Sequence, residues 1–161
     1  MKKQYFGARR ITATPMTRAA YNEFRGWKVP SDENQNDEGF LIEDHAGVSN
    51  HPAFKGYISW VIKNQFEATY RPIDGMSFGL AIEALKLGDR VSRAGWNGKG
   101  MFLFAVPGSE SKVNQFSLKD TYPENARFTI RPHINMFTVD GEVVPWVASQ
   151  TDILADDWRI V

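Results

Sequence analysis

The hydrophobic and polar positions change their periodicity along the chain, and these changes predict its secondary structure. The clearest helix pattern lies in residues 77–88, where apolar side chains recur at intervals of three and four. Ser77 can cap the start of this helix, and Gly88 can end it. Residues 101–106 are apolar without alternation, which indicates a strand covered on both faces. In so small a domain, we expect another subunit to supply the second cover.

The first half of the chain predicts a small β-α-β-β-α module. Thr17 can cap its first helix, and Gly26 can end that helix. Short runs of β-branched and aromatic residues, separated by polar connections, favour strands. The expected strands are residues 10–13, 40–42 and 57–60, and the expected helices follow Thr17 and span residues 61–70.

The second half predicts a small antiparallel sheet packed against the helix at residues 77–88. Asp140 and Gly141 form a tight hairpin signal between two strands, and Ser149 or Thr151 can cap a short helical turn. Residues 107–125 are expected to form a long polar connection. The fold class is therefore α+β, with further strands expected at residues 90–93, 128–131, 134–139, 143–144 and 158–161.

A domain boundary is expected near residues 71–75, which read RPIDG. Proline disfavours helix at the residue before it, and Asp-Gly favours a turn. We therefore expect an N-terminal module of unknown role at residues 1–73 and a ligand-binding domain at residues 75–161.

Composition excludes several classes of function. The chain has 161 residues, and its 42% hydrophobic content is enough for one ordinary domain or two small ones. Nineteen basic residues balance nineteen acidic residues, which disfavours a general DNA- or RNA-binding protein. Cysteine is absent, so disulfides and thiolate metal sites are excluded. No apolar segment is long enough to span a membrane and no secretion signal is recognisable, so we expect a cytoplasmic protein.

No catalytic or metal-binding constellation is recognisable. The three histidines are scattered, and neither a serine nucleophile elbow nor a phosphate-binding loop is present. Asp156 and Asp157 are adjacent, but neighbouring side chains diverge, so they are not expected to form an acid–base pair. We predict no catalytic residue, no metal and no cofactor.

Two segments, which we call the tryptophan motifs, instead suit a ligand with flat rings, hydroxyls and phosphates: residues 93–101 and residues 146–158. Trp96 and Trp146 can stack on a base, and Asp152 and Asn97 can bind ribose hydroxyls. Backbone N–H groups, hydroxyls and cations of the same segments can bind phosphate. The alternative is that the glycines of residues 95–100 only make a turn between two strands. For Trp27, Trp60 and Trp158 we expect packing in the core rather than contact with a ligand. The candidate ligand-binding residues are Arg93, Gly95, Trp96, Asn97, Lys99, Met101, Trp146, Ser149, Thr151 and Asp152.

The second half resembles the Thoeris anti-defence 2 family. Its motifs occur in order as MSFGLAIEALK at residues 76–86, RAGWNGKGM at 93–101, VPWVASQTD at 144–152 and DW at 157–158. The resemblance implies a non-enzymatic phage protein, typically a tetramer, that sequesters the glycocyclic ADP-ribose signal of bacterial Thoeris immunity. Some relatives also bind cyclic oligonucleotide signals.

Two other functions remain open from the sequence. One is an enzyme that degrades the same class of signal, which would need a metal cluster or a poised acid–base pair. The other is a structural phage component, which would explain the apolar strand at residues 101–106 but not the polar residues of the tryptophan motifs. The first half looks like a small phage module with no assigned activity.

Overall fold

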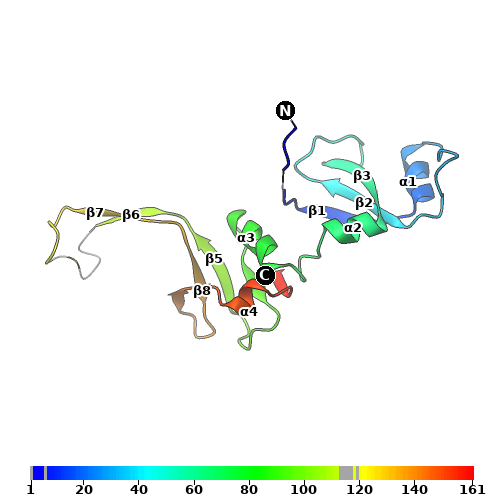
Figure 1. The fold of residues 1–161 in the computed structure, drawn as a ribbon. Helices are drawn as coiled ribbons and strands as arrows, with labels where there is room; N and C mark the ends of the chain where they lie inside the picture. Colours follow the sequence, from blue (N-terminus) through cyan, green and yellow to red (C-terminus); the bar gives the residue numbers. More distant parts are fainter. Residues whose placement is uncertain (1, 6, 113–117, 119) are drawn as a thin grey trace. The chain divides into compact units, whose positions relative to one another are not determined.

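A computed structural model describes residues 2–5, 7–112, 118 and 120–161 (Figure 1). Contacts within the chain divide it into two compact units, Met1–Arg71 and Pro72–Val161. Both units combine helices with antiparallel sheet, which confirms the predicted α+β class. In the described part of the chain, no helix has the length and apolar character needed to cross a membrane.

The first unit is a three-stranded antiparallel sheet with two helices. Strand β2 lies between β1 and β3, and the elements follow in the order β1, α1, β2, β3, α2 (Figure 1). Their bounds are β1 Ile11–Pro15, α1 Arg18–Arg25, β2 Gly39–Asp44, β3 Tyr57–Ile62 and α2 Lys63–Thr69.

Helix α1 begins and ends where the sequence predicts. The Thr17 hydroxyl accepts a hydrogen bond from the backbone N–H of Ala20, which satisfies one otherwise unpaired donor. Gly26 ends the helix at φ 69°, a left-handed conformation that glycine adopts without steric cost. The helix packs on the sheet through a small core made of Tyr21, Leu41 and Ile58.

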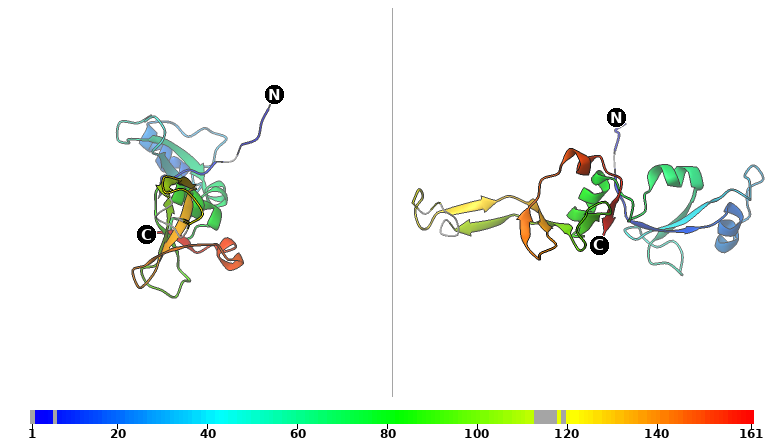
Figure 2. Two further views of the ribbon diagram at one scale, coloured as in Figure 1. Left: turned by 90° about the vertical axis from the view of Figure 1, so that its left-hand side faces the viewer. Right: turned by 90° about the horizontal axis from the view of Figure 1, so that it is seen from below.

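The second unit is a five-stranded antiparallel sheet with helix α3 against it (Figures 1 and 2). Its strand order is β10-β4-β5-β8-β9, so the last strand of the chain lies at one edge of the sheet, beside β4. A short helix, α4, precedes β10. The bounds are α3 Phe78–Lys86, β4 Val91–Arg93, β5 Phe102–Val106, β8 His133–Phe137, β9 Val143–Pro145, α4 Gln150–Ile153 and β10 Trp158–Ile160.

Trp158 is the largest side chain in the core of the second unit. It is fully buried, as are Ala81 of α3 and Leu103 of β5. Met76 and Trp158 exchange two backbone hydrogen bonds of 2.8 and 3.1 Å, which attach the segment before α3 to β10. Burial of a side chain this large stabilises the unit by about 2–3 kcal/mol or more, so core packing is the role of Trp158, as predicted.

Two predictions from the sequence are wrong. The connection at 107–125 is not entirely loop, because β6 (Ser109–Lys112) pairs with β7 (Arg127–Ile130) in a ribbon beyond β5 and β8 (Figure 2). Residues 113–117 and 119 of that connection lie outside the described residues. Trp27 is not a core residue, since 54% of it is exposed, whereas Trp60 packs against the core of the first unit.

Candidate functional site

Strand pairing brings the two tryptophan motifs together in the second unit. Strands β4 and β10 are antiparallel, with Arg93 opposite Trp158. The turn that follows β4 therefore lies beside the segment that precedes β10. This segment contains α4 and the loop before it, so residues about 60 positions apart in sequence meet at one end of the sheet.

Arg93 is the centre of the contacts between the two motifs. Its Nε donates to Asp157 at 2.8 Å, and its Nη1 donates to Asp152 at 3.0 Å and to the Thr151 carbonyl at 3.2 Å. The side chain is only 19% exposed. Its hydrogen bonds to Asp157 and then Asp152 raise the pKa of Arg93, so the cation is held in place and neutralised by the protein.

Asp157 connects the turn to the strand beside it. One carboxylate oxygen binds Arg93, and the other accepts the backbone N–H of Gly95 at 2.7 Å. The hydrogen bond from Arg93 is the main cause that lowers the pKa of Asp157. This residue was absent from the sequence-based candidates, although it belongs to the DW pair at 157–158. Its role depends on a partner 64 residues away, which local sequence does not reveal.

Asp152 combines a helix cap with the contacts to the turn. Its Oδ2 accepts from the Ser149 hydroxyl at 2.6 Å and the Ser149 backbone N–H at 3.1 Å, and Ser149 caps α4 in return. Its Oδ1 accepts from Arg93 and, at 3.4 Å, from the indole N–H of Trp96. Burial alone would raise the pKa of Asp152, but the hydrogen bonds from Ser149 and Arg93 outweigh burial and lower it. Both carboxylate oxygens are thus used within the protein.

Three tryptophans form an aromatic cluster beside this network. Ring centroids of Trp96 and Trp146 lie 6.5 Å apart, and each lies within 6.1 Å of buried Trp158. Phe78 of α3 contacts both Trp146 and Trp158. Trp96 and Trp146 are only partly buried, so part of each ring remains accessible to a ligand.

The remaining predicted site residues differ in their exposure. Asn97 and Lys99 are exposed on the turn between β4 and β5. Met101 packs beside Gly98, where an added Cβ would collide with its sulfur, so this turn is compact. The hydroxyls of Ser149 and Thr151 lie 2.8 Å apart on the surface. Within the described residues, no group of three or more acidic, histidine or cysteine side chains is placed to bind a metal.

The structure therefore divides the candidates into two sets. Arg93, Gly95 and Asp152 use their polar groups within the protein and fix the two motifs against each other. The other set presents partly or fully exposed surface: Trp96, Asn97, Lys99, Met101, Trp146, Ser149 and Thr151.

The site lies within a segment that matches known proteins. The Thoeris anti-defense 2-like domain family matches residues 76–161, which include every residue of the network and the aromatic cluster. Thoeris anti-defense 2 of Bacillus phage SP01 is 44% identical over 87 residues, which cover 53% of this chain and 94% of the phage protein. The first unit lies outside the family match. The chain belongs to the Thoeris anti-defense 2-like family.

Proposed function

We propose that this protein counters bacterial Thoeris immunity by binding and holding its signal, glycocyclic ADP-ribose, without cleaving it. The family match and the name of the Bacillus phage relative support an anti-defence role. The observation that carries the proposal is the network around Arg93, which joins the two tryptophan motifs, so that the partly exposed Trp96 and Trp146 lie close together in segments that also carry exposed hydroxyls, an amide and a cation. The protein would act in the cytoplasm of the infected cell.

The accessible groups match the chemistry of such a ligand. Trp96 and Trp146 would contact the flat base, and a stacked base contributes about 1–3 kcal/mol. Lys99 would bind phosphate, since among the described residues no acid forms an ion pair with it. Asn97, Ser149 and Thr151 would supply polar contacts to ribose and phosphate.

Arg93 and Asp152 take a different role from the one that their residue types suggest. We assign them to positioning, because the Arg93 cation is already bound by two carboxylates. A free phosphate would have to displace Asp152 or Asp157 to reach it. Gly95 would act in the same way, since its N–H is occupied by Asp157.

The state of the carboxylates supports binding over catalysis. Hydrogen bonds lower the pKa values of both Asp152 and Asp157, so both are ionised at neutral pH and neither can act as a general acid. Both are also directed at Arg93 and backbone groups rather than at open space. An enzyme that cleaves a pyrophosphate or glycosidic bond would need a proton donor that these residues do not supply.

We further propose that the protein works as a homo-oligomer, for which the family resemblance implies a tetramer. Side chains of a strand alternate between its faces, so Phe102 and Phe104 lie on the face opposite to buried Leu103. Both phenylalanines remain partly exposed, and Phe102 stacks on Phe137 with a centroid distance of 5.0 Å. A second copy that covered this apolar face would remove it from water.

Calorimetry with glycocyclic ADP-ribose tests this assignment. Trp146→Leu should weaken binding by about 5- to 150-fold, the range that corresponds to loss of one stacked base. Lys99→Gln should also weaken binding, whereas Lys86→Gln serves as its matched control. Lys86 is an exposed lysine of α3 whose one ion pair among the described residues is with Glu83 on the same helix. If both the Trp146 and Lys99 variants keep wild-type affinity and circular dichroism, the site is elsewhere.

A further inference from the structure

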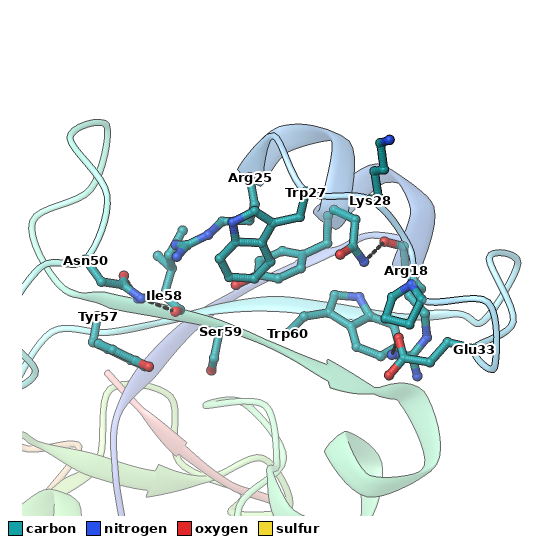
Figure 3. A pocket seen from close by; sticks show the side chains of 13 residues that line it. Arg18, Arg25, Trp27, Lys28, Glu33, Asn50, Tyr57, Ile58, Ser59 and Trp60 are labelled. Atoms are coloured by element: carbon teal, nitrogen blue, oxygen red, sulfur yellow. Dashed lines mark hydrogen bonds and ion pairs between the residues drawn. The ribbon is translucent and has the colours of Figure 1, made fainter.

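The first unit contains a pocket that the family match does not cover. Its volume is about 580 Å³, within the range of small-molecule sites. Figure 3 shows α1 and the loop after it above strand β3, with Arg25 and Trp27 on the helix side and Trp60 on the strand. Helix, loop and strand all belong to the compact unit Met1–Arg71, so the pocket is formed within one unit.

Arg25 brings an uncompensated charge to this pocket. Its guanidinium lies over the ring of Trp27, 4.4 Å from the ring centroid. Its Nη1 is buried, yet no described residue accepts a hydrogen bond from it. Buried donors in folded proteins are almost always paired, so the described protein leaves this guanidinium without the hydrogen bonds that a structural arginine makes. Among the described residues, no carboxylate forms an ion pair with Arg25 either.

Arg18 lines the same pocket but differs from Arg25, because carboxylates of the protein pair with its guanidinium. It lies over the ring of Trp60 at 4.5 Å, but its guanidinium binds Glu33 at 2.6 Å and Asp37 at 3.1 Å. Its charge is therefore balanced. The pocket keeps a net positive charge from Arg25 and from Lys28, an exposed lysine at the rim that no described acid pairs with.

Trp27 adds an aromatic surface beside the unpaired cation. It is 54% exposed, which is a large exposed fraction for a tryptophan in a unit with a small core. It contacts Tyr21 edge to face, with centroids 6.1 Å apart. Burial raises the pKa of Tyr21, so its hydroxyl stays protonated and can donate a hydrogen bond into the pocket.

We propose that this pocket binds a small phosphorylated ligand with a planar ring, of the nucleoside monophosphate class. Because Nη1 is enclosed, the phosphate meets the other two guanidinium nitrogens of Arg25, Nε and Nη2, whose parallel N–H groups match two phosphate oxygens. Lys28 reaches the same phosphate on its flexible side chain. The ligand's ring lies against the exposed surface of Trp27, where stacking tolerates different bases. The first unit thus carries a ligand site of its own, distinct from the site in the second unit.

Calorimetry of the full chain with AMP and with UMP tests the proposal, with adenosine and inorganic phosphate as partial ligands. Both nucleotides should bind more tightly than either partial ligand. Arg25→Gln should weaken binding about tenfold or more, and Arg25→Lys should recover only part of it because an ammonium lacks the fork. Trp27→Leu should weaken AMP binding while leaving phosphate binding unchanged. Lys55→Gln changes an exposed lysine of the same unit outside the pocket and should have no effect.

Several outcomes would overturn the proposal. Absence of AMP and UMP binding at millimolar concentration would exclude a nucleotide site. If inorganic phosphate binds as tightly as AMP, the ring of the ligand does not contribute to binding. Loss of AMP binding in Trp146→Leu together with wild-type binding in Arg25→Gln would place the nucleotide in the second unit. That last result would leave the function proposed for the second unit intact, so the two hypotheses fail separately.

Discussion

Replacing Arg93 by glutamine should destabilise the second unit more than any other single change in the turn. The side chain is 19% exposed and donates to two carboxylates and one carbonyl. Glutamine keeps a polar amide, but it is shorter than arginine and loses the charge and the fork. Asp152 and Asp157 would then lose the cation that pairs with both of them.

The size of the effect follows from the exposure of the two carboxylates. A charge-assisted hydrogen bond contributes about 1.5–3 kcal/mol. The Asp152 side chain is 13% exposed, so its bond is little screened, whereas 33% exposure of Asp157 favours the lower end of the range. We expect a loss of about 2–4 kcal/mol in the free energy of unfolding. For a unit of this size, this corresponds to a fall in Tm of about 10–25 °C.

Scanning calorimetry measures this fall, and hydrogen exchange of peptides from β4 and β10 assigns the transition to the second unit. Lys99→Gln is the control, because this neighbouring cation is exposed and pairs with no described acid. Arg93→Lys should be intermediate, since one ammonium cannot reproduce the planar fork. A fall of less than about 3 °C for Arg93→Gln would refute the network as the element that holds the motifs together.

Four further outcomes are expected. Asp152→Ala should weaken signal binding about tenfold or more, while Asp156→Ala should not; equal affinities would remove Asp152 from the site. The lowered pKa values of Asp152 and Asp157 give stability that is present above the unfolded value of about 3.9 and lost as pH falls through the folded values. A midpoint of urea unfolding that stays constant as the pH falls through this range would contradict this expectation. Phe104→Asp should split the oligomer in light scattering, and a wild-type monomer at micromolar concentration would exclude that interface. A chain beginning at Gly75 should fold and bind the signal within a few-fold of the full chain, and insolubility or a large loss would argue for an integrated fold.

Local features of the fold were predictable because their causes are local. A cap depends on one hydroxyl and the backbone a few residues away, so Thr17 and Ser149 cap their helices as their sequence context predicts. Ser77 also occupies the N-cap position of α3, but its hydroxyl makes no capping hydrogen bond, so that part of the prediction is wrong. Strand β5 follows from its unbroken apolar run, and burial of Trp158 follows from its place in an apolar strand. Strand β6 was missed because its sequence, SESK, is polar, and its pairing with β7 is what makes it a strand.

The roles of the site residues depended on contacts that sequence does not contain. Arg93 and Asp152 have the right chemistry for phosphate and ribose, but the structure uses that chemistry internally. The sequence identifies Asp157 only as a neighbour of Asp156 that is not expected to form an acid–base pair with it, and this gives no reason to include Asp157 in the site. Trp27 was assigned to the core by residue type, whereas its position after the end of α1 leaves it exposed. In each case the partner lies in another element, and only the fold identifies it.

The central claim is that the second unit holds its signal intact, and release after denaturation tests this most directly. The full chain is incubated with glycocyclic ADP-ribose, freed of unbound ligand, heated to unfold the protein, and the released compound is identified by mass spectrometry. We expect one compound with the mass and chromatographic behaviour of the starting signal, released in proportion to the protein and much reduced for Trp146→Leu. Recovery of cleavage fragments, or of no ligand at all from the wild-type protein, would contradict it.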